Sequence, residues 1–255
     1  MAGGKEITGK IQSIGNTMKV TSALEKVSAS KIRKSQELMQ ASRPYVRMMR
    51  RIGGHLSKAN PEIRHPFTVK YDTVEKVGYI IVSTDRGLCG GLNSNLFKTT
   101  LGHISDWQER GAGVNLVTLG KKASAFFKNI NVDIIGHVSN LGESPQIEDL
   151  IGAVRIMLNA YRDNEIQRLY VVYNEFVNTM TQKPTVSQML PLPPVEEESA
   201  EYSYSWDYIY EPDTKTLLDE VAVRYIEGVI YQAVLENLAS EHAARMLAMK
   251  NATDN

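Results

Sequence analysis

The sequence predicts an α/β fold in which two long terminal helices form an antiparallel coiled coil that brackets a domain with a mostly parallel sheet. Two observations lead to this expectation. Apolar residues recur with helical spacing over residues 1–58 and again over residues 214–255. Between these segments, β-branched runs alternate with amphipathic runs, which is typical of a parallel sheet with helices on both faces. The chain has 255 residues, enough to bury a sizeable core.

The segment over residues 1–58 is predicted to be the first helix of the coiled coil. Apolar residues spaced by three or four positions run from Ile7 to Leu56, and small or polar residues separate them. The apolar stripe is therefore narrow. A helix of about 50 residues would extend roughly 80 Å, which is too long for a compact domain of this size. Pro44 lies inside the segment and is expected to bend or interrupt the helix.

The middle of the chain, residues 70–192, is predicted to be a Rossmann-like α/β domain. Apolar β-branched and aromatic runs indicate strands, and the amphipathic runs between them indicate helices. Because strands and helices alternate, the sheet is expected to be mostly parallel, with helices on both faces. The expected strands cover residues 77–83, 114–119, 132–138, 169–176 and 185–192, and the expected helices cover residues 93–109, 121–130 and 145–163.

An irregular connection is expected over residues 193–213, because prolines and a run of glutamates there precede a stretch rich in aromatic residues. Helical periodicity resumes at Thr214 and continues to Asn255, which predicts the second helix of the coiled coil over residues 214–255. A small sheet domain is not expected to bury the apolar stripe of either long helix. The two helices are therefore expected to pack on each other and to project from the domain.

The composition is that of an ordinary globular protein whose charge is unevenly distributed. Residues 1–58 carry 12 Lys and Arg and only 3 Asp and Glu, whereas the formal net charge of the whole chain is zero. A basic segment favours an anionic partner, although a solvated helix face has the same composition. No apolar run is long enough for a membrane helix, and the N-terminus carries no recognisable targeting sequence. The single cysteine, Cys89, excludes an internal disulfide bond and fits a cytoplasmic protein.

A glycine-rich stretch over residues 83–97, STDRGLCGGLNSNLF, is the strongest candidate for a chemical site. It lacks the lysine and hydroxyl that follow the last glycine of a phosphate-binding loop. Its GLCGG segment matches the spacing of a nucleophile turn, with Cys89 as the nucleophile and His103, His137 or His242 as the base. Three residues separate this turn from the preceding strand, so the tight turn of hydrolases is not reproduced. A cysteine-dependent α/β hydrolase stays an alternative to close packing of glycines around a small buried thiol.

Other chemical functions find less support in the sequence. The histidines lack metal-ligand spacing, so no metal, cofactor or catalytic residue is expected. A basic coiled coil that binds nucleic acid is a third interpretation. It is the weakest of the three, because the basic helix lacks interleaved aromatic residues, and no nucleic-acid partner is expected.

Five stretches of the chain resemble the gamma subunit of bacterial F-type ATP synthases. They are residues 1–36, VSTDRGLCGGLNSNLF, TVSQMLPLP, SWDYIYEPD and VIYQAVLENLASEHAARMLAMKNATDN, and they occur in family order along the chain. The resemblance implies a non-catalytic rotor subunit of the central stalk, present in one copy per complex. Such a subunit turns inside a hexamer of alpha and beta subunits, beside the epsilon subunit. It transmits rotation of the c ring and couples proton flow to ATP synthesis. The resemblance further implies a peripheral position at the cytoplasmic face of the bacterial inner membrane.

The resemblance also implies contact residues. Basic residues of the first helix would meet acidic lever segments of the beta subunits, with Lys10, Lys19, Lys26, Lys31, Arg33 and Lys34 as candidates. Contacts with epsilon and the c ring would involve Trp206, Tyr208, Tyr210 and Glu211, although Trp206 and Tyr210 serve equally well as anchors of their loop. Asp85 and Arg86, at the rim of the glycine-rich turn, are further candidates for subunit contact. Family members continue the second helix past Asn255, so this helix is expected to be cut short here.

Overall fold

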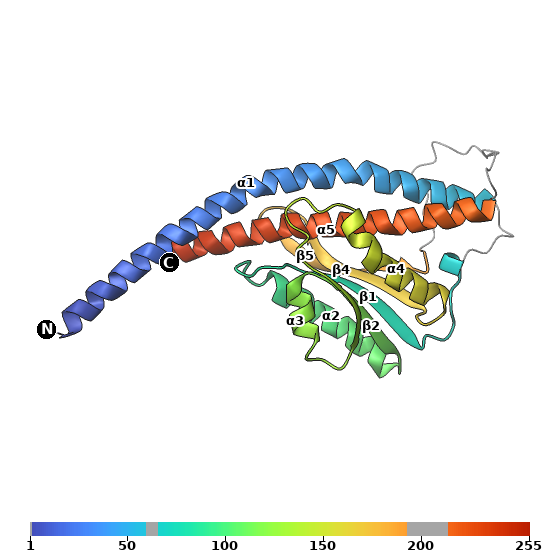
Figure 1. Cartoon of the computed structure of the whole chain (residues 1–255), viewed down its shortest axis with the longest axis horizontal. Helices are drawn as coiled ribbons and strands as arrows, with labels where there is room; N and C mark the ends of the chain where they lie inside the picture. Colours follow the sequence, from blue (N-terminus) through green and yellow to red (C-terminus); the bar gives the residue numbers. More distant parts are fainter. Residues whose placement is uncertain (1, 60–65, 193–213) are drawn as a thin grey trace.

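Two long helices lie side by side along one side of an α/β domain in the computed structural model, which describes residues 2–59, 66–192 and 214–255 (Figure 1). Helix α1 spans Ala2–Ala59, and helix α5 spans Thr214–Asp254. The helices are antiparallel, and the N-terminal end of α1 projects beyond the C-terminal end of α5 (Figure 1). The predicted pair of terminal helices around an α/β domain is confirmed.

The sheet has five strands in the order β3-β2-β1-β4-β5. The first four strands in the chain are parallel, and β5 pairs antiparallel with β4. The prediction of a mostly parallel sheet is therefore confirmed. The strands span Lys76–Val82 (β1), Gly113–Leu119 (β2), Asp133–Val138 (β3), Arg168–Phe176 (β4) and Gln182–Leu190 (β5), and a short 3-10 helix, η1, spans Pro66–Thr68.

Helices cover both faces of the sheet, as predicted. Side chains alternate along β1, so Tyr79 and Ile81 belong to one core cluster and Ile80 and Val82 to the other. The cluster with Tyr79 packs against α2 and α3, and the cluster with Ile80 packs against α4 and α5. The three helices of the α/β domain span Leu92–Glu109 (α2), Lys121–Phe127 (α3) and Glu148–Arg162 (α4).

Helix α5 packs on the sheet as well as on α1. Its Ile226 and Ile230 are fully buried in the same core cluster as β1 and α4. Further along, Asn237 Oδ1 accepts a 2.9 Å hydrogen bond from Asn174 Nδ2 in β4, and Ser240 Oγ donates to the Asn174 carbonyl at 3.0 Å. The expectation that a small sheet could not bury either long helix is therefore wrong for α5. The sheet face beside α4 is wide enough to bury this helix, and α1 then packs on the side of α5 that remains.

Helix α1 continues through Pro44 without interruption. The predicted interruption is wrong, and the exposure of the helix around Pro44 explains why. A proline removes the hydrogen bond to the carbonyl four residues earlier, here that of Gln40. Pro44 and Gln40 are both exposed, so water can satisfy this carbonyl. The helix as a whole follows a smooth curve (Figure 1).

Candidate partner interface

Among the residues that the structure describes, no helix lies beside the N-terminal part of α1, which exposes an apolar stripe. The hydroxyls of Thr21 and Thr253 are 2.6 Å apart, and Thr253 is one residue before the last residue of α5, Asp254. N-terminal to Thr21 are four apolar side chains that are 48% to 68% exposed: Ile7, Ile11, Ile14 and Met18. These residues continue, at seven-residue spacing, the face of α1 that contacts α5 through Thr21 and carries the buried Ile32, so the stripe is an extension of the helix–helix seam.

Two of the six basic residues predicted to contact a partner form ion pairs within α1. Lys10 Nζ lies 2.9 Å from Glu6 Oε1, and Arg33 Nε lies 3.0 Å from Glu37 Oε1. All four side chains are well exposed, and ion pairs of this spacing on a helix surface contribute only about 0.3–0.5 kcal/mol. Lys10 and Arg33 therefore remain available to a partner.

Lys31 is different, because it pairs with a residue of the α/β domain. Its ammonium group contacts the Glu143 carboxylate in the loop over residues 139–147, between β3 and α4. The hydrogen bond from Lys31 lowers the pKa of Glu143. Three further candidates, Lys19, Lys26 and Lys34, are exposed and form no ion pair within the described ranges. The basic surface predicted from the sequence is thus present on α1, and Lys31 is partly used inside the molecule.

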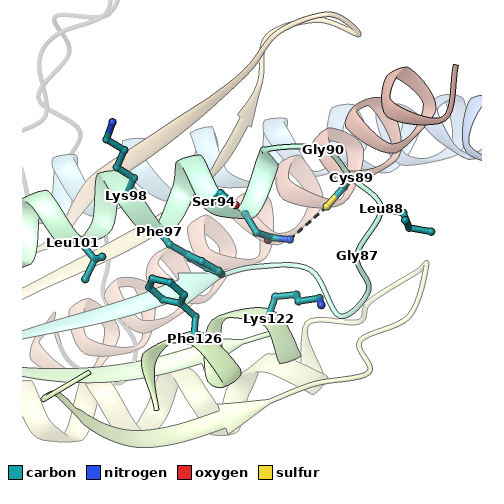
Figure 2. Close-up of a pocket in the computed structure, with 11 residues that line it drawn as sticks. Gly87, Leu88, Cys89, Gly90, Ser94, Phe97, Lys98, Leu101, Lys122 and Phe126 are labelled. Carbon is teal, nitrogen blue, oxygen red and sulfur yellow. Dashed lines mark hydrogen bonds between the residues drawn. The ribbon is translucent and has the colours of Figure 1, made fainter. Parts of the chain in front are cut away.

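The glycine-rich turn joins β1 to α2 and packs against α5. Leu88 and Gly90 both have positive φ, 62° and 56°, and a Cβ on Gly90 would lie 3.8 Å from the Ala248 Cβ of α5. Beside the turn is an open pocket of about 470 Å³, which Phe126 and Lys122 of α3 line from the opposite side (Figure 2). The glycine in this turn thus permits the backbone conformation and the close approach to α5.

Asp85 and Arg86, at the rim of this turn, have different surroundings. Asp85 accepts backbone hydrogen bonds from Lys121 N–H at 3.0 Å and from Asn140 N–H at 2.8 Å, so its carboxylate joins the glycine-rich turn to the start of α3 and to the 139–147 loop. Arg86 is exposed. Asp85 therefore has a role within the chain, and contact of either residue with another subunit stays a prediction.

Cys89 does not have the surroundings of a nucleophile. Its side chain is 3% exposed, and Asn93 Nδ2 donates to its sulfur at 3.4 Å (Figure 2). Burial raises the pKa of the thiol, and nearby Glu241 raises it further, so the reactive thiolate is disfavoured at neutral pH. The hydrolase alternative thus finds no support here, and the interpretation of Cys89 as a small buried side chain fits its burial.

Two of the three candidate bases for Cys89 lie within hydrogen-bond distance of other side chains. His103 Nδ1 lies 2.7 Å from the Tyr79 hydroxyl, and His137 Nδ1 lies 3.0 Å from the Thr118 hydroxyl. His242 lies on α5, where burial, together with the neighbouring cations Arg245 and Lys31, lowers its pKa to about 4. In the described part of the chain, no histidine is hydrogen-bonded to the Cys89 sulfur.

A polar cluster on α5 holds the glycine-rich turn, and the sequence analysis did not predict it. The Arg245 guanidinium donates to Glu241 Oε1 at 2.5 Å and to the Gly87 carbonyl at 3.2 Å. Burial raises the pKa of Glu241, and the positive charge of Arg245 opposes that rise. The signal in the sequence was the run ENLASEHAAR, in which charged residues interrupt an apolar helix. Such residues are buried only when they have partners.

The remaining sequence predictions concern the aromatic connection, metal ions and membrane helices. Trp206, Tyr208, Tyr210 and Glu211 lie outside the described residues, so their contacts stay predictions. Within the described ranges, no group of three or more His, Cys, Asp or Glu side chains could hold a metal ion. No helix in those ranges is long and apolar enough to cross a membrane.

Comparison with known proteins gives consistent results over the full length of the chain. A family model described as ATP synthase matches residues 3–255. The ATP synthase gamma chain of Xanthomonas campestris pv. campestris (strain B100) is 56% identical over all 255 residues, which cover 88% of that protein. The ATP synthase gamma chain of Stenotrophomonas maltophilia (strain K279a) is 54% identical with the same coverage.

A solved structure has the same fold. In the central stalk and c ring structure of the Tetrahymena thermophila mitochondrial ATP synthase, one chain matches with a TM-score of 0.66. The match covers 91% of the present chain and 99% of the other, at 18% sequence identity. At this identity the likeness concerns the fold.

Proposed function

The chain belongs to the ATP synthase gamma chain family, and we propose that it is the rotor subunit of the central stalk. In this function it transmits rotation of the c ring to the hexamer of alpha and beta subunits, and it couples proton flow to ATP synthesis. As a gamma chain it is a non-catalytic subunit of the complex. One observation carries the proposal: α1 and α5 pair into a single shaft that is seated on the α/β domain (Figure 1).

The packing of α5 suits a part that must transmit torque. Ile226 and Ile230 are fully buried between α5 and the sheet, and interiors of this density deform little. A force applied to the α/β domain therefore acts directly on α5, and α1 follows through its contacts with α5. The domain and the shaft are expected to turn as one body.

The exposed side chains of α1 suit a contact that changes as the shaft turns. Lys19, Lys26 and Lys34 extend from the helix surface, and charge contacts act over a longer range and depend less on exact fit than apolar packing does. We place the alpha and beta subunits around α1, with Arg86 as a further contact at the glycine-rich turn. We place epsilon and the c ring at the aromatic connection that contains Trp206 and Tyr210. We further propose that the chain lies at the cytoplasmic face of the inner membrane, held there through the complex.

Charge reversal on α1 tests both the partner and the surface. We expect the tagged chain to co-purify with alpha, beta and epsilon subunits. The variant Lys19→Glu/Lys26→Glu/Lys34→Glu should bind the hexamer about tenfold more weakly, because the loss of three exposed contacts of about 0.5 kcal/mol each amounts to about 1.5 kcal/mol. The loss should shrink as salt is raised, since exposed charges are screened.

A control of equal charge uses exposed lysines of the α/β domain. Lys70→Glu/Lys128→Glu/Lys183→Glu changes the net charge by the same amount away from α1 and should leave hexamer binding unchanged. Equal weakening by both variants would overturn the assignment of the surface. A wild-type chain that captures none of the three subunits would overturn the proposed function itself.

A further inference from the structure

On the face of α1 that contacts α5, residue types recur every seven positions. Small hydroxyl residues occupy one set of positions, and Glu25, Ile32, Met39 and Val46 occupy another. A seven-residue repeat brings chemically similar side chains to the same place when one helix slides past the other by one repeat. Glu25 is the exception in its set, because one of the two shifts would bring it to the place of the buried Ile32. Elsewhere, packing along this seam discriminates poorly between the observed register and one displaced by about 10 Å. The hydroxyl set is Thr21, Ser28, Ser35 and Ser42.

Two polar contacts join α1 to α5 with equal spacing on both helices. The Thr21 and Thr253 hydroxyls are 2.6 Å apart, and the Ser42 hydroxyl donates to Gln232 Oε1. The two contacts are 21 residues apart on each helix, which is three seven-residue repeats. They therefore enclose the middle of the seam and lie on the same face of α1.

A third polar contact lies halfway between them and comes from the α/β domain. Lys31 pairs with Glu143, which belongs to the 139–147 loop. This loop is held in place without α1: the Tyr231 hydroxyl of α5 donates to the Pro145 carbonyl at 3.1 Å, and Asn140 N–H donates to Asp85 at 2.8 Å. Glu143 is thus positioned by α5 and the domain before it meets Lys31.

Each of these contacts penalises a displaced register. A shift of one repeat brings either Leu24 or Leu38 to the place of Lys31, so the Glu143 pair is lost in both directions. One shift also brings Ile14 opposite Thr253, and the other brings Met49 opposite Gln232.

Another ion pair across the seam is less selective. Arg43 Nη2 lies 3.6 Å from Glu236 Oε1. One of the two shifts would bring a second arginine, at position 50 of the sequence, to the place of Arg43. Discrimination against a shift in either direction therefore rests mainly on the three contacts of Thr21, Lys31 and Ser42, since Glu25 opposes only one of the two shifts.

We propose that these three polar contacts set the register of α1 on the rest of the chain, and that the seam alone does not. Polar groups in a coiled-coil seam commonly specify register at a cost in stability. The proposal concerns the chain by itself. Only its consequence rests on the proposed function, since the register decides which residues the shaft presents to its partners at a given height.

Distance measurement on the full chain tests the proposal. Spin labels are attached at Thr8→Cys on the projecting part of α1 and at Lys250→Cys on α5, both exposed, while Cys89 is buried and stays unlabelled. The labelled protein should give a single distance. With Thr21→Val/Ser42→Ala/Glu143→Gln added, a second distance should appear, displaced by about 10 Å, while the melting temperature is equal or higher. A single unchanged distance in this variant would overturn the proposal.

A charge exchange keeps the test decisive if the triple variant folds poorly. Thr21→Val/Ser42→Ala combined with Lys31→Glu/Glu143→Lys restores one contact of the opposite polarity and should restore the single distance. The control Asp219→Asn removes a 2.6 Å ion pair with Arg162 between α4 and α5, away from the seam, and should not add a second distance. A second distance in this control, or its persistence after the exchange, would contradict the proposal. Because no partner is present, these outcomes are independent of whether the chain assembles with other subunits.

Discussion

The variant Gly120→Ala is expected to lose most of its folding stability. Gly120 follows β2 with φ 101°, a region that residues with a Cβ rarely adopt. A Cβ at this position would lie 2.4 Å from the Ser83 carbonyl oxygen, far inside contact distance. The backbone cannot move apart at either residue without losing a hydrogen bond. Ser83 N–H donates to the Leu119 carbonyl and Gly120 N–H donates to the Val138 carbonyl, each at 2.8 Å. We expect a loss of about 3 kcal/mol or more, measured by chemical denaturation followed by circular dichroism.

The matched control for this variant is Gly102→Ala. Gly102 lies on the exposed side of α2, and a Cβ there would meet no other atom within 4 Å. Because alanine favours a helix over glycine, this change should raise the free energy of unfolding by up to about 1 kcal/mol. If Gly120→Ala proved as stable as the wild type, the close approach of β2 and the Ser83 segment would not be as described.

The second large effect is expected for Ile230→Ala in α5. Ile230 is fully buried in the cluster that joins α5 to the sheet and α4. Its truncation removes apolar contacts and leaves a cavity, which costs about 2–5 kcal/mol in cores of this kind. The measurement is again the free energy of unfolding, and the domain and shaft should lose stability in a single transition because they share this core.

A truncation on the other helix provides the comparison. Val27 lies on α1 and is 47% exposed, so Val27→Ala should change the free energy of unfolding by no more than about 0.5 kcal/mol. Equal losses in the two variants would mean that α5 is not the helix that holds the domain.

Much of the fold could be predicted because its signals are local. The first expected strand, residues 77–83, differs from β1 by one residue at each end, since β-branched runs mark buried strands well. The last strand was expected to begin at 185 but begins at Gln182. Pro184 lies in the part of β5 that was not expected, and it is accommodated because β5 is at the edge of the sheet, where a proline need not donate to a neighbour.

The burial of α5 on the sheet was missed for a reason that the sequence does contain. The sequence was interpreted as having a single apolar stripe on this helix, and this stripe did not include Ile226 and Ile230. These residues lie on the side that faces the sheet, while other apolar residues of α5 face α1. A helix that is apolar on more than one side is buried on more than one side.

The candidate interface could be predicted as a charge pattern but not as a set of contacts. Composition alone placed the basic residues on one helix. That Lys31 meets Glu143, which is 112 residues away in the chain, depends on how the 139–147 loop crosses α5. The assignment of Asp85 to a role within the chain likewise depends on two loops that only the tertiary fold brings together.

The central claim is that α1, α5 and the α/β domain turn as one body inside a ring of other subunits. The direct measurement is rotation of a bead attached at Lys128→Cys, an exposed position on the α/β domain, with the alpha and beta hexamer fixed to a surface. On addition of ATP, the account predicts stepwise rotation in one direction, with pauses that repeat with the symmetry of the hexamer. A hexamer that hydrolyses ATP at its full rate while the bead only fluctuates about one angle would contradict it.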